Sequence, residues 1–239
     1  QVNMQITCEE GSFVEPPHPK VALGPEEEEL RLRYRKRKAW AVGHATSVSW
    51  SEETLRSAPD SIAMDFMPLT DVFDFKSGRH VEATFDSAVL SPRALSEAHD
   101  AAKLKASLSD FVDSFASWLE IRSRIEVDPI HAGALSAVIE KLKVQEDRLR
   151  MGVEVLCDET APERLQAFRL ANAAMLDQME ATWRKKGNED DGDFDPDSVT
   201  WYPFQLAFQL LSIPGTIGDV PDSGRELVDL LWFPTGGGK

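Results

Sequence analysis

The sequence is poor in cysteine and has no long apolar run. Its 239 residues include only Cys8 and Cys157, far apart in the chain, which indicates neither a disulfide framework nor a metal cluster and favours a reducing cytoplasm. No stretch approaches the roughly 18 apolar residues of a membrane span. The first residues, QVNMQITCEE, also lack the basic and apolar regions of a signal peptide. These absences argue against a disulfide-rich secreted domain and against a membrane protein.

Positive charge is scarce as well. The chain has 26 Lys and Arg against 41 Asp and Glu, which gives a formal net charge of −15. This excess argues against a protein that coats nucleic acid with its whole surface, because repulsion would oppose phosphate binding. Any DNA contact must therefore be local. With 42% hydrophobic and 28% charged residues, the chain is globular and long enough for two units.

Residues 1–90 are predicted to form a mostly antiparallel β domain. Apolar and polar side chains alternate there in the manner of half-buried strands. The alternation occurs at Val2–Cys8, Ile62–Phe66 and Val81–Phe85.

A basic segment, LRLRYRKRKAWAVGHATSVSW, lies at the centre of this domain. If it is a strand, Arg31, Arg33 and Arg35 share one face, which predicts a contact with the DNA backbone. The alternative is a solvated face whose charge is balanced by Glu26–Glu29.

Gly43 and His44 are expected within the next strand. A glycine in a strand usually marks a bulge or a close approach of another backbone segment. His44 has no second His or Cys nearby, so we assign it no catalytic role and predict no metal site.

From Ser91 onward the apolar spacing changes to three and four residues, which predicts a helical bundle. Ser91 is a suitable N-cap before Pro92. One or two helices are expected before Asp128, followed by helices at about 132–156 and about 161–185. Several arginines of the last two helices alternate with acidic residues and are interpreted as solvated helix faces; these are Arg148, Arg150, Arg164 and Arg169.

The segment 187–200 contains GNEDDGDFDPDS and has no apolar period. It is interpreted as a mobile acidic linker, or alternatively as an acidic segment that occupies a DNA-binding groove until DNA displaces it. The predicted domains are a β-rich accessory domain at 1–90, a helical bundle at 91–186 and an ATPase-like part at 201–239.

The stretch from residue 227 to the end carries the most informative pattern. Leu227–Phe233 is an apolar run of strand length, as in the buried parallel sheet of an α/β domain. Three consecutive glycines then let backbone N–H groups point inward around a phosphate, and a lysine supplies a positive charge. We interpret this stretch as a phosphate-binding loop, with a flexible glycine-rich tail as the alternative. The loop comprises Thr235, Gly236, Gly237, Gly238 and Lys239.

The strict phosphate-loop pattern has Gly where Phe233 stands and Ser or Thr after Lys239, where this sequence stops. We therefore expect the chain to be the front part of a longer protein. Residues 1–239 alone are expected not to hydrolyse ATP, because the hydroxyl and carboxylates that hold magnesium would lie downstream.

A candidate adenine-reading element lies ahead of this loop. Phe204 and Gln205 precede an apolar helix at 206–211 that is expected to end at Pro214-Gly215. The amide of Gln205 can both donate to and accept from the edge of adenine. The alternative is that Gln205 only caps or packs beside the helix start.

These segments resemble the helicase subunit of the DISARM anti-phage defence system, a superfamily-two helicase. The specific part of the resemblance is WYPFQLAFQLLSIPG at 201–215 together with VDLLWFPTGGGK at 228–239. The resemblance extends over most of the chain through AWAVGH at 39–44, RLRMGVEVL at 148–156 and AFRLANAAMLDQ at 167–178.

The resemblance implies an α+β protein in which the β domain and the helical bundle precede the first elements of a RecA-like ATPase domain. It implies that Gln205 reads the adenine of ATP and that Lys239 binds its phosphates, with Mg²⁺. The implied activity is that of an ATP-dependent helicase or translocase. It would act on phage DNA with a single-stranded part, together with companion DISARM subunits, in the bacterial cytoplasm. The alternatives are a P-loop ATPase that remodels protein and a non-catalytic module that binds DNA or a partner.

Overall fold

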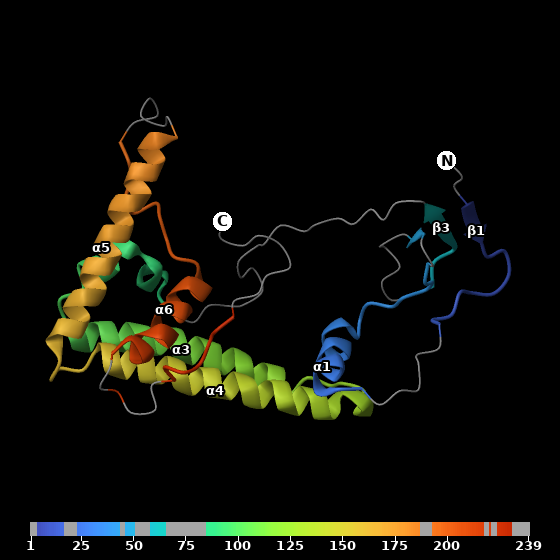
Figure 1. Cartoon of the computed structure of the whole chain (residues 1–239), viewed down its shortest axis with the longest axis horizontal. Helices are drawn as coiled ribbons and strands as arrows, with labels where there is room; N and C mark the ends of the chain where they lie inside the picture. Colours follow the sequence, from blue (N-terminus) through green and yellow to red (C-terminus); the bar gives the residue numbers. More distant parts are fainter. Residues whose placement is uncertain are drawn as a thin grey trace. The chain divides into compact units, whose positions relative to one another are not determined.

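The structure is a computed structural model that describes residues 4–16, 23–43, 46–50, 58–65, 85–186, 193–217, 220 and 224–230. The chain divides into two compact units. The first comprises residues 1–74, 126–138 and 235–239, and the second comprises 75–125 and 139–234. A small antiparallel sheet and several long helices agree with the expected α+β class (Figure 1).

The first unit contains a three-stranded antiparallel sheet with the order β1-β3-β2. The strands are β1 (Met4–Thr7), β2 (Ser47–Ser49) and β3 (Ser61–Asp65). Met4 and Val48 both pair with Met64, so their apolar side chains lie on the same face of the sheet. β1 and β3 confirm the strands expected from alternation, whereas residues 81–84 lie outside the described residues.

The basic segment begins as a helix, so the strand predicted for it is wrong. α1 spans Pro25–Tyr34, with Gly24 as the N-cap and Pro25 at the first helical position. The backbone N–H of Gly24 donates to Oε2 of Glu27 at 2.8 Å. Acidic residues occupy the first turn, and Arg31 and Arg33 occupy the last turn. The helix dipole favours negative charge at the N-terminal end and positive charge at the C-terminal end. These capping and charge signals favour a helix more strongly than the short alternation of apolar residues and arginine favours a strand.

Gly43 lies outside the three described strands, against expectation, but the predicted close backbone approach is present. A Cβ atom at this position would lie 2.2 Å from the carbonyl oxygen of Thr46. A larger residue would therefore displace the backbone. His44 lies outside the described residues.

The helices expected from residue 91 onward are confirmed. Two helices, rather than one, precede Asp128, and Oγ of Ser91 accepts from the backbone N–H of Ala94 at 3.2 Å, as expected of an N-cap. None of the described helices is long and apolar enough to cross a membrane. The helical elements are η2 (Ser87–Leu90), α2 (Pro92–Ser96), α3 (Ala101–Ser123), η3 (Pro129–His131), α4 (Ala132–Leu156), α5 (Pro162–Lys185) and α6 (Pro203–Thr216).

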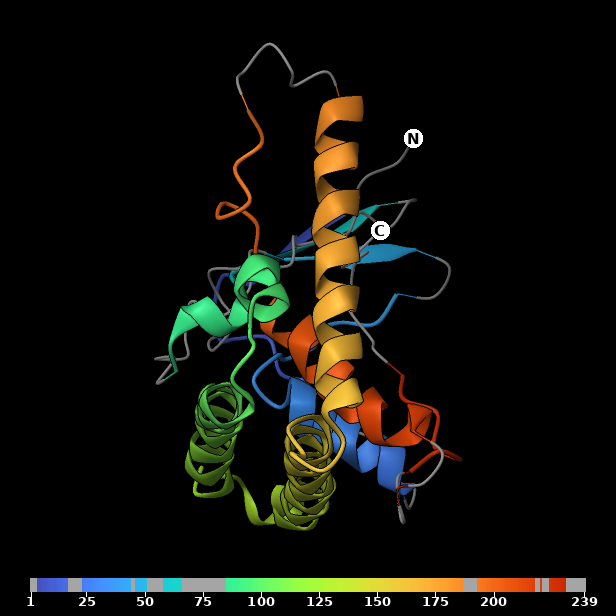
Figure 2. The same ribbon diagram turned by 90° about the vertical axis from the view of Figure 1, so that its left-hand side faces the viewer.

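The core of the second unit lies between α3, α4, α5 and α6. α3 and the part of α4 in this unit are antiparallel and lie side by side, which Figures 1 and 2 show from two directions. Ion pairs between Lys105 and Glu154 and between Asp113 and Arg150 join these two helices. The most deeply buried side chains are at most 1% exposed and include Leu108, Val112, Leu156, Leu206 and Leu210.

Cys8 and Cys157 are both free thiols. Cys157 is buried in the core of the second unit. Burial raises the pKa of its thiol to about 11, because a thiolate is poorly solvated there. Cys157 is therefore a protonated core residue at neutral pH.

The second half of the acidic segment is held by the helical unit. Nη1 of Arg93 donates to Asp197 at 2.9 Å, and the backbone N–H of Trp201 donates to the carbonyl of Leu90 at 2.7 Å. The indole N–H of Trp201 donates at 2.8 Å to Oδ1 of Asn172, a residue of α5 that is 1% exposed. Residues 187–192 lie outside the described residues, and the mobile-linker interpretation stays a prediction.

Candidate nucleotide-binding site

Gln205 lies at the start of α6, where it caps the helix. Oε1 of its side chain accepts from the backbone N–H of Tyr202 at 2.9 Å, and its backbone N–H donates to the carbonyl of Tyr202 at 2.8 Å. A Gln at the third helical position satisfies an otherwise unpaired donor in this way. The bond uses one lone pair of Oε1 and leaves the two donors of Nε2 without a partner among the described residues. Gln205 is thus a cap of α6, and its contact with adenine stays a prediction.

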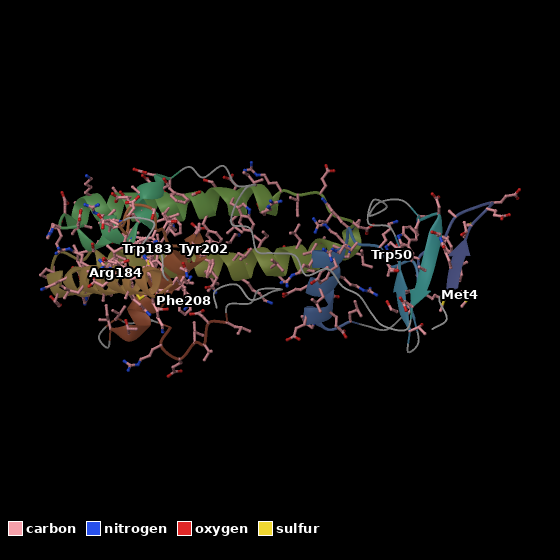
Figure 3. All side chains as sticks on the ribbon, turned by 90° about the horizontal axis from the view of Figure 1, so that it is seen from above. Met4, Trp50, Trp183, Arg184, Tyr202 and Phe208 are labelled. Carbon is pink, nitrogen blue, oxygen red and sulfur yellow. The ribbon has the colours of Figure 1, made fainter. Side chains whose placement is uncertain are left out.

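An exposed aromatic surface lies beside Gln205. The rings of Tyr202 and Phe204 are stacked, with centroids 5.7 Å apart and planes inclined by 9°. Tyr202 is 49% exposed, and Phe208, about one turn beyond Phe204 on α6, is 37% exposed (Figure 3). A flat aromatic surface next to an amide donor suits a planar base, because stacking and an edge hydrogen bond are then available together.

α6 is fixed by close packing on α4. Pro214 lies within α6, and because proline has no N–H, the carbonyl of Leu210 lacks its usual helical donor. That carbonyl is directed at Gly152 of α4, where an added Cβ would lie 2.1 Å from the oxygen. The helix includes Pro214 and ends at Thr216, one residue beyond the expected end at Pro214-Gly215. Tertiary packing supports the turn that the sequence alone disfavours.

The segment that leads toward the predicted phosphate loop is tied to α4. Arg148 donates to both carboxylate oxygens of Asp229, from Nη1 to Oδ1 and from Nη2 to Oδ2, each at 2.6 Å. This hydrogen bonding raises the pKa of Arg148 and lowers the pKa of Asp229. The interpretation of Arg148 as part of a solvated helix face is wrong, because its side chain is only 14% exposed.

The described part of the predicted buried strand, Leu227–Leu230, is neither a strand nor buried. Val228 is 94% exposed and Leu230 is 84% exposed. An extended apolar segment becomes a sheet strand only when a neighbouring strand supplies hydrogen-bond partners. Among the described residues, no strand pairs with Leu227–Leu230.

The residues of the predicted phosphate loop lie outside the described residues. They are Thr235, Gly236, Gly237, Gly238 and Lys239, together with the end of the predicted strand at 231–233. The structure therefore describes the predicted adenine-reading element but not its predicted phosphate-binding partner. Among the described residues, no three His, Cys, Asp or Glu side chains are arranged to hold a metal ion.

The three arginines predicted to contact DNA are placed on and just after α1. Arg31 and Arg35 are one helical turn apart and lie on the same side, whereas Arg33 is rotated by about 200° from Arg31 at 100° per residue. Nη1 of Arg35 donates to the carbonyl of Leu32 at 2.8 Å. The continuous basic stripe of a strand is thus absent, while the contact with DNA stays a prediction.

Two polar contacts near the candidate site have no signal in the sequence. Arg148 and Asp229 are 81 residues apart, and Trp201 and Asn172 are 29 apart. Arg148 sits among alternating charges and looks like any solvated arginine, and Asn172 lies within an ordinary helical pattern. No local signal distinguishes either residue from a surface residue.

The comparisons with known proteins give one similarity that bears on this arrangement. No model of a known protein family matches the chain. The chain is similar to DISARM protein DrmA of Bacillus paralicheniformis. The two are 27% identical over 213 residues, which cover 86% of this chain and 19% of DrmA. The chain thus spans about a fifth of the length of this curated relative.

Proposed function

We propose that this chain is part of an ATP-driven DNA helicase or translocase that works in anti-phage defence. The observation that carries the proposal is the similarity to DISARM protein DrmA, which runs over 86% of the chain. The order of an aromatic-Gln element and a glycine-lysine loop supports it independently, because ATP-driven motors need a base-reading group and a phosphate-binding group.

The residues at the start of α6 fit the adenine end of ATP. The stacked rings of Tyr202 and Phe204 offer a surface for the base, and Nε2 of Gln205 donates to an acceptor on the adenine edge. Because Oε1 of Gln205 already accepts from Tyr202, the side chain is held in one orientation before ATP binds. ATP supplies the free energy that drives movement along DNA.

At the other end of ATP, Lys239 and the N–H groups of Gly236–Gly238 bind the β- and γ-phosphates in this proposal. Lys239 would neutralise charge that develops during phosphoryl transfer, and Mg²⁺, when bound with ATP, would supply further positive charge there. Companion subunits of a defence system and phage DNA are the proposed partners, with Arg31, Arg33 and Arg35 as candidate backbone contacts.

The test is DNA-stimulated ATP hydrolysis by the full-length protein that contains this chain. Lys239→Ala should abolish hydrolysis and weaken ATP binding, since the phosphates lose their point charge. Lys143→Ala is the matched control, because Lys143 is an exposed lysine of α4 whose ion pair is with Glu140. Hydrolysis that DNA does not stimulate would favour protein remodelling. No ATP binding at all would refute the proposal and favour a non-catalytic module.

A further inference from the structure

Asn172 is a polar residue in the middle of α5 that is only 1% exposed. Helix propensity does not favour asparagine at such a position, and a buried amide costs free energy unless its oxygen and its nitrogen are both hydrogen-bonded. Both are bonded here. Nδ2 donates to the carbonyl of Phe168 at 2.9 Å, and Oδ1 accepts from the indole N–H of Trp201 at 2.8 Å. The first bond lies within α5, so the tertiary contact that this side chain makes is its bond with Trp201.

Trp201 is fixed at two points of the second unit. Its indole N–H is bound by Asn172 of α5, and its backbone N–H donates to the carbonyl of Leu90, the last residue of η2, at 2.7 Å. Trp201 is 7% exposed and belongs to the apolar core of this unit. A residue whose side chain and backbone are bonded to different elements has little freedom to shift. Trp201 is therefore a fixed point directly before Tyr202, the N-cap of α6.

The amide and the rings that are proposed to contact the base both depend on the backbone at Tyr202. The backbone N–H of Tyr202 donates to Oε1 of Gln205 at 2.9 Å, which sets the orientation of the amide. The ring of Tyr202 stacks on that of Phe204, with centroids 5.7 Å apart. A shift of the backbone at Tyr202 would therefore move the amide and the stacked rings together. Because Trp201 is the preceding residue, its bond with Asn172 restrains that backbone.

We propose that Asn172 and Trp201 are positioning residues for base recognition: their hydrogen bond holds the backbone at Tyr202 so that the amide of Gln205 meets the edge of adenine. The inference rests on the proposed function, because it assigns a task at the same site. All four residues belong to the second unit and to the part of the chain that the structure describes.

The preference for ATP over GTP measures this task, because the two nucleotides carry identical phosphates and differ only in the base. Stacking on Tyr202 and Phe204 serves both bases, since every base has a π-face. An amide donor turned toward the edge of adenine is matched to that base alone, because guanine presents a different set of donors and acceptors. Loss of one such hydrogen bond corresponds to a roughly two- to twelvefold change in Kd. Variants that release Trp201 should therefore lower the preference for ATP by about this factor.

The experiment compares variants of the full-length protein that contains this chain. Asn172→Leu removes the acceptor and Trp201→Phe removes the donor, so each leaves one buried polar group without its partner. The double variant removes both groups, which should restore stability because neither stays unpaired. Leu119→Ala is the matched control, because Leu119 is a buried residue of α3 outside the apolar cluster of Trp201 and its loss destabilises through a cavity alone. The measurements are the melting temperature and the Kd values of the β,γ-imido analogues of ATP and GTP.

Both single variants should lower the melting temperature, and they should lower the preference for ATP roughly two- to twelvefold. The double variant should recover most of the melting temperature and keep the low preference, whereas Leu119→Ala should lower the melting temperature alone. In a Gln205→Glu background, Asn172→Leu should cause no further loss of preference, because it acts through that amide. A further loss there would overturn the inference. An unchanged preference in the single variants, or its recovery in the double variant, would assign the pair to stability alone and would overturn it too.

The Gln205→Glu variant separates the positioning role from the proposed function. If Gln205→Glu abolishes the preference for ATP while the Asn172 and Trp201 variants keep it, the proposed function stands and only the positioning role fails. If the unmodified protein binds neither analogue, both fail.

Discussion

At the scale of single residues, the cap formed by Gln205 and its proposed contact with adenine use different atoms. Oε1 of Gln205 accepts from Tyr202 and caps α6, while Nε2 is the proposed donor to the nucleotide. The capping alternative raised by the sequence is therefore correct, and it does not compete with reading adenine, since the two use different atoms of one amide. In the proposed site, the cap would hold the amide donor in position before the nucleotide binds.

Gln205→Glu distinguishes these purposes. A glutamate at the third helical position keeps the acceptor that caps α6, so the melting temperature should not change. It removes the amide donor, so the Kd for ATP should rise by roughly 2- to 12-fold, the equivalent of about 0.5–1.5 kcal/mol for one hydrogen bond. Titration with GTP controls for the added charge. An equal loss of affinity for ATP and GTP in Gln205→Glu would leave Gln205 with its capping role alone. Gln205→Ala removes the cap as well, so it should lower both ATP affinity and thermal stability.

At the scale of helices, the contact between α4 and α6 depends on the absence of one side chain. Gly→Ala within a helix ordinarily stabilises by about 0.5–1 kcal/mol. At Gly152 the new methyl would lie 2.1 Å from the backbone oxygen of Leu210, and a backbone atom cannot move aside without shifting α6. The steric clash should therefore outweigh the usual stabilisation, so that Gly152→Ala lowers the free energy of unfolding.

Gly152→Ala should destabilise the protein by roughly 1–3 kcal/mol, as overpacking of a core does, and should lower ATP affinity because α6 carries Gln205. Chemical denaturation measures the free energy of unfolding. Gly133→Ala is the control on the same helix, because a Cβ there meets nothing within 4 Å; it should be neutral or slightly stabilising. Equal effects at the two glycines would contradict the close approach of α4 and α6.

The helical conformation of α1 sharpens the DNA prediction. If Arg31, Arg33 and Arg35 contact phosphates, their replacement by Gln should flatten the dependence of log affinity on log salt by roughly 0.7–0.9 per lost contact, without a change in sequence preference. Since Arg31 and Arg35 share a side of the helix, the double variant lacking them should account for most of the change. DNA binding by the full-length protein across a salt series provides the measurement.

The control for this experiment removes the same amount of charge elsewhere, by changing Arg122, Arg124 and Lys143 of the helical unit to Gln. An unaltered slope in the α1 variants would make these arginines partners of the nearby glutamates only. In that case the loss should appear as lower thermal stability of the first unit.

At the scale of the whole molecule, burial is distributed unevenly between the two units. The second unit has one continuous apolar core drawn from α2 to α6. In the described part of the first unit, every residue of β1 is exposed, and Ile62 is the residue of β3 that is fully buried. Trp40 of that unit also buries its indole N–H without a hydrogen-bond partner among the described residues, which costs about 1–3 kcal/mol.

We therefore expect the first unit to open at a lower free energy than the second. Native-state hydrogen exchange should show the amides of β3 exchanging at least about tenfold faster than those near Leu108 in α3, a difference of at least about 1.4 kcal/mol. α2, a short helix at the edge of the same core, serves as an internal reference for local fraying. Equal protection of β3 and α3 would show instead that the two units unfold together.

The sequence predicted the helices of the second unit well, because their signals are local. Ser91 before Pro92 marks the start of α2, and the apolar spacing of three and four residues marks α3, α4 and α5. The same local reasoning failed for α1, where a six-residue alternation was given more weight than a proline start and an acid-to-base charge order. Periodicity over so short a stretch cannot distinguish a strand from a helix, whereas capping can.

By itself, the sequence determined the α+β class and most helix bounds of the second unit, since each depends on neighbours within a few positions, while the adenine-reading and phosphate-binding roles stay predictions. Tertiary structure alone decided that α6 continues through Pro214, that Asp229 is held by Arg148, and that Trp201 is held by Asn172. It also left Leu227–Leu230 exposed rather than paired as a strand. These outcomes depend on partners tens of residues away, and a residue's own type does not reveal which distant group will come within hydrogen-bond distance of it.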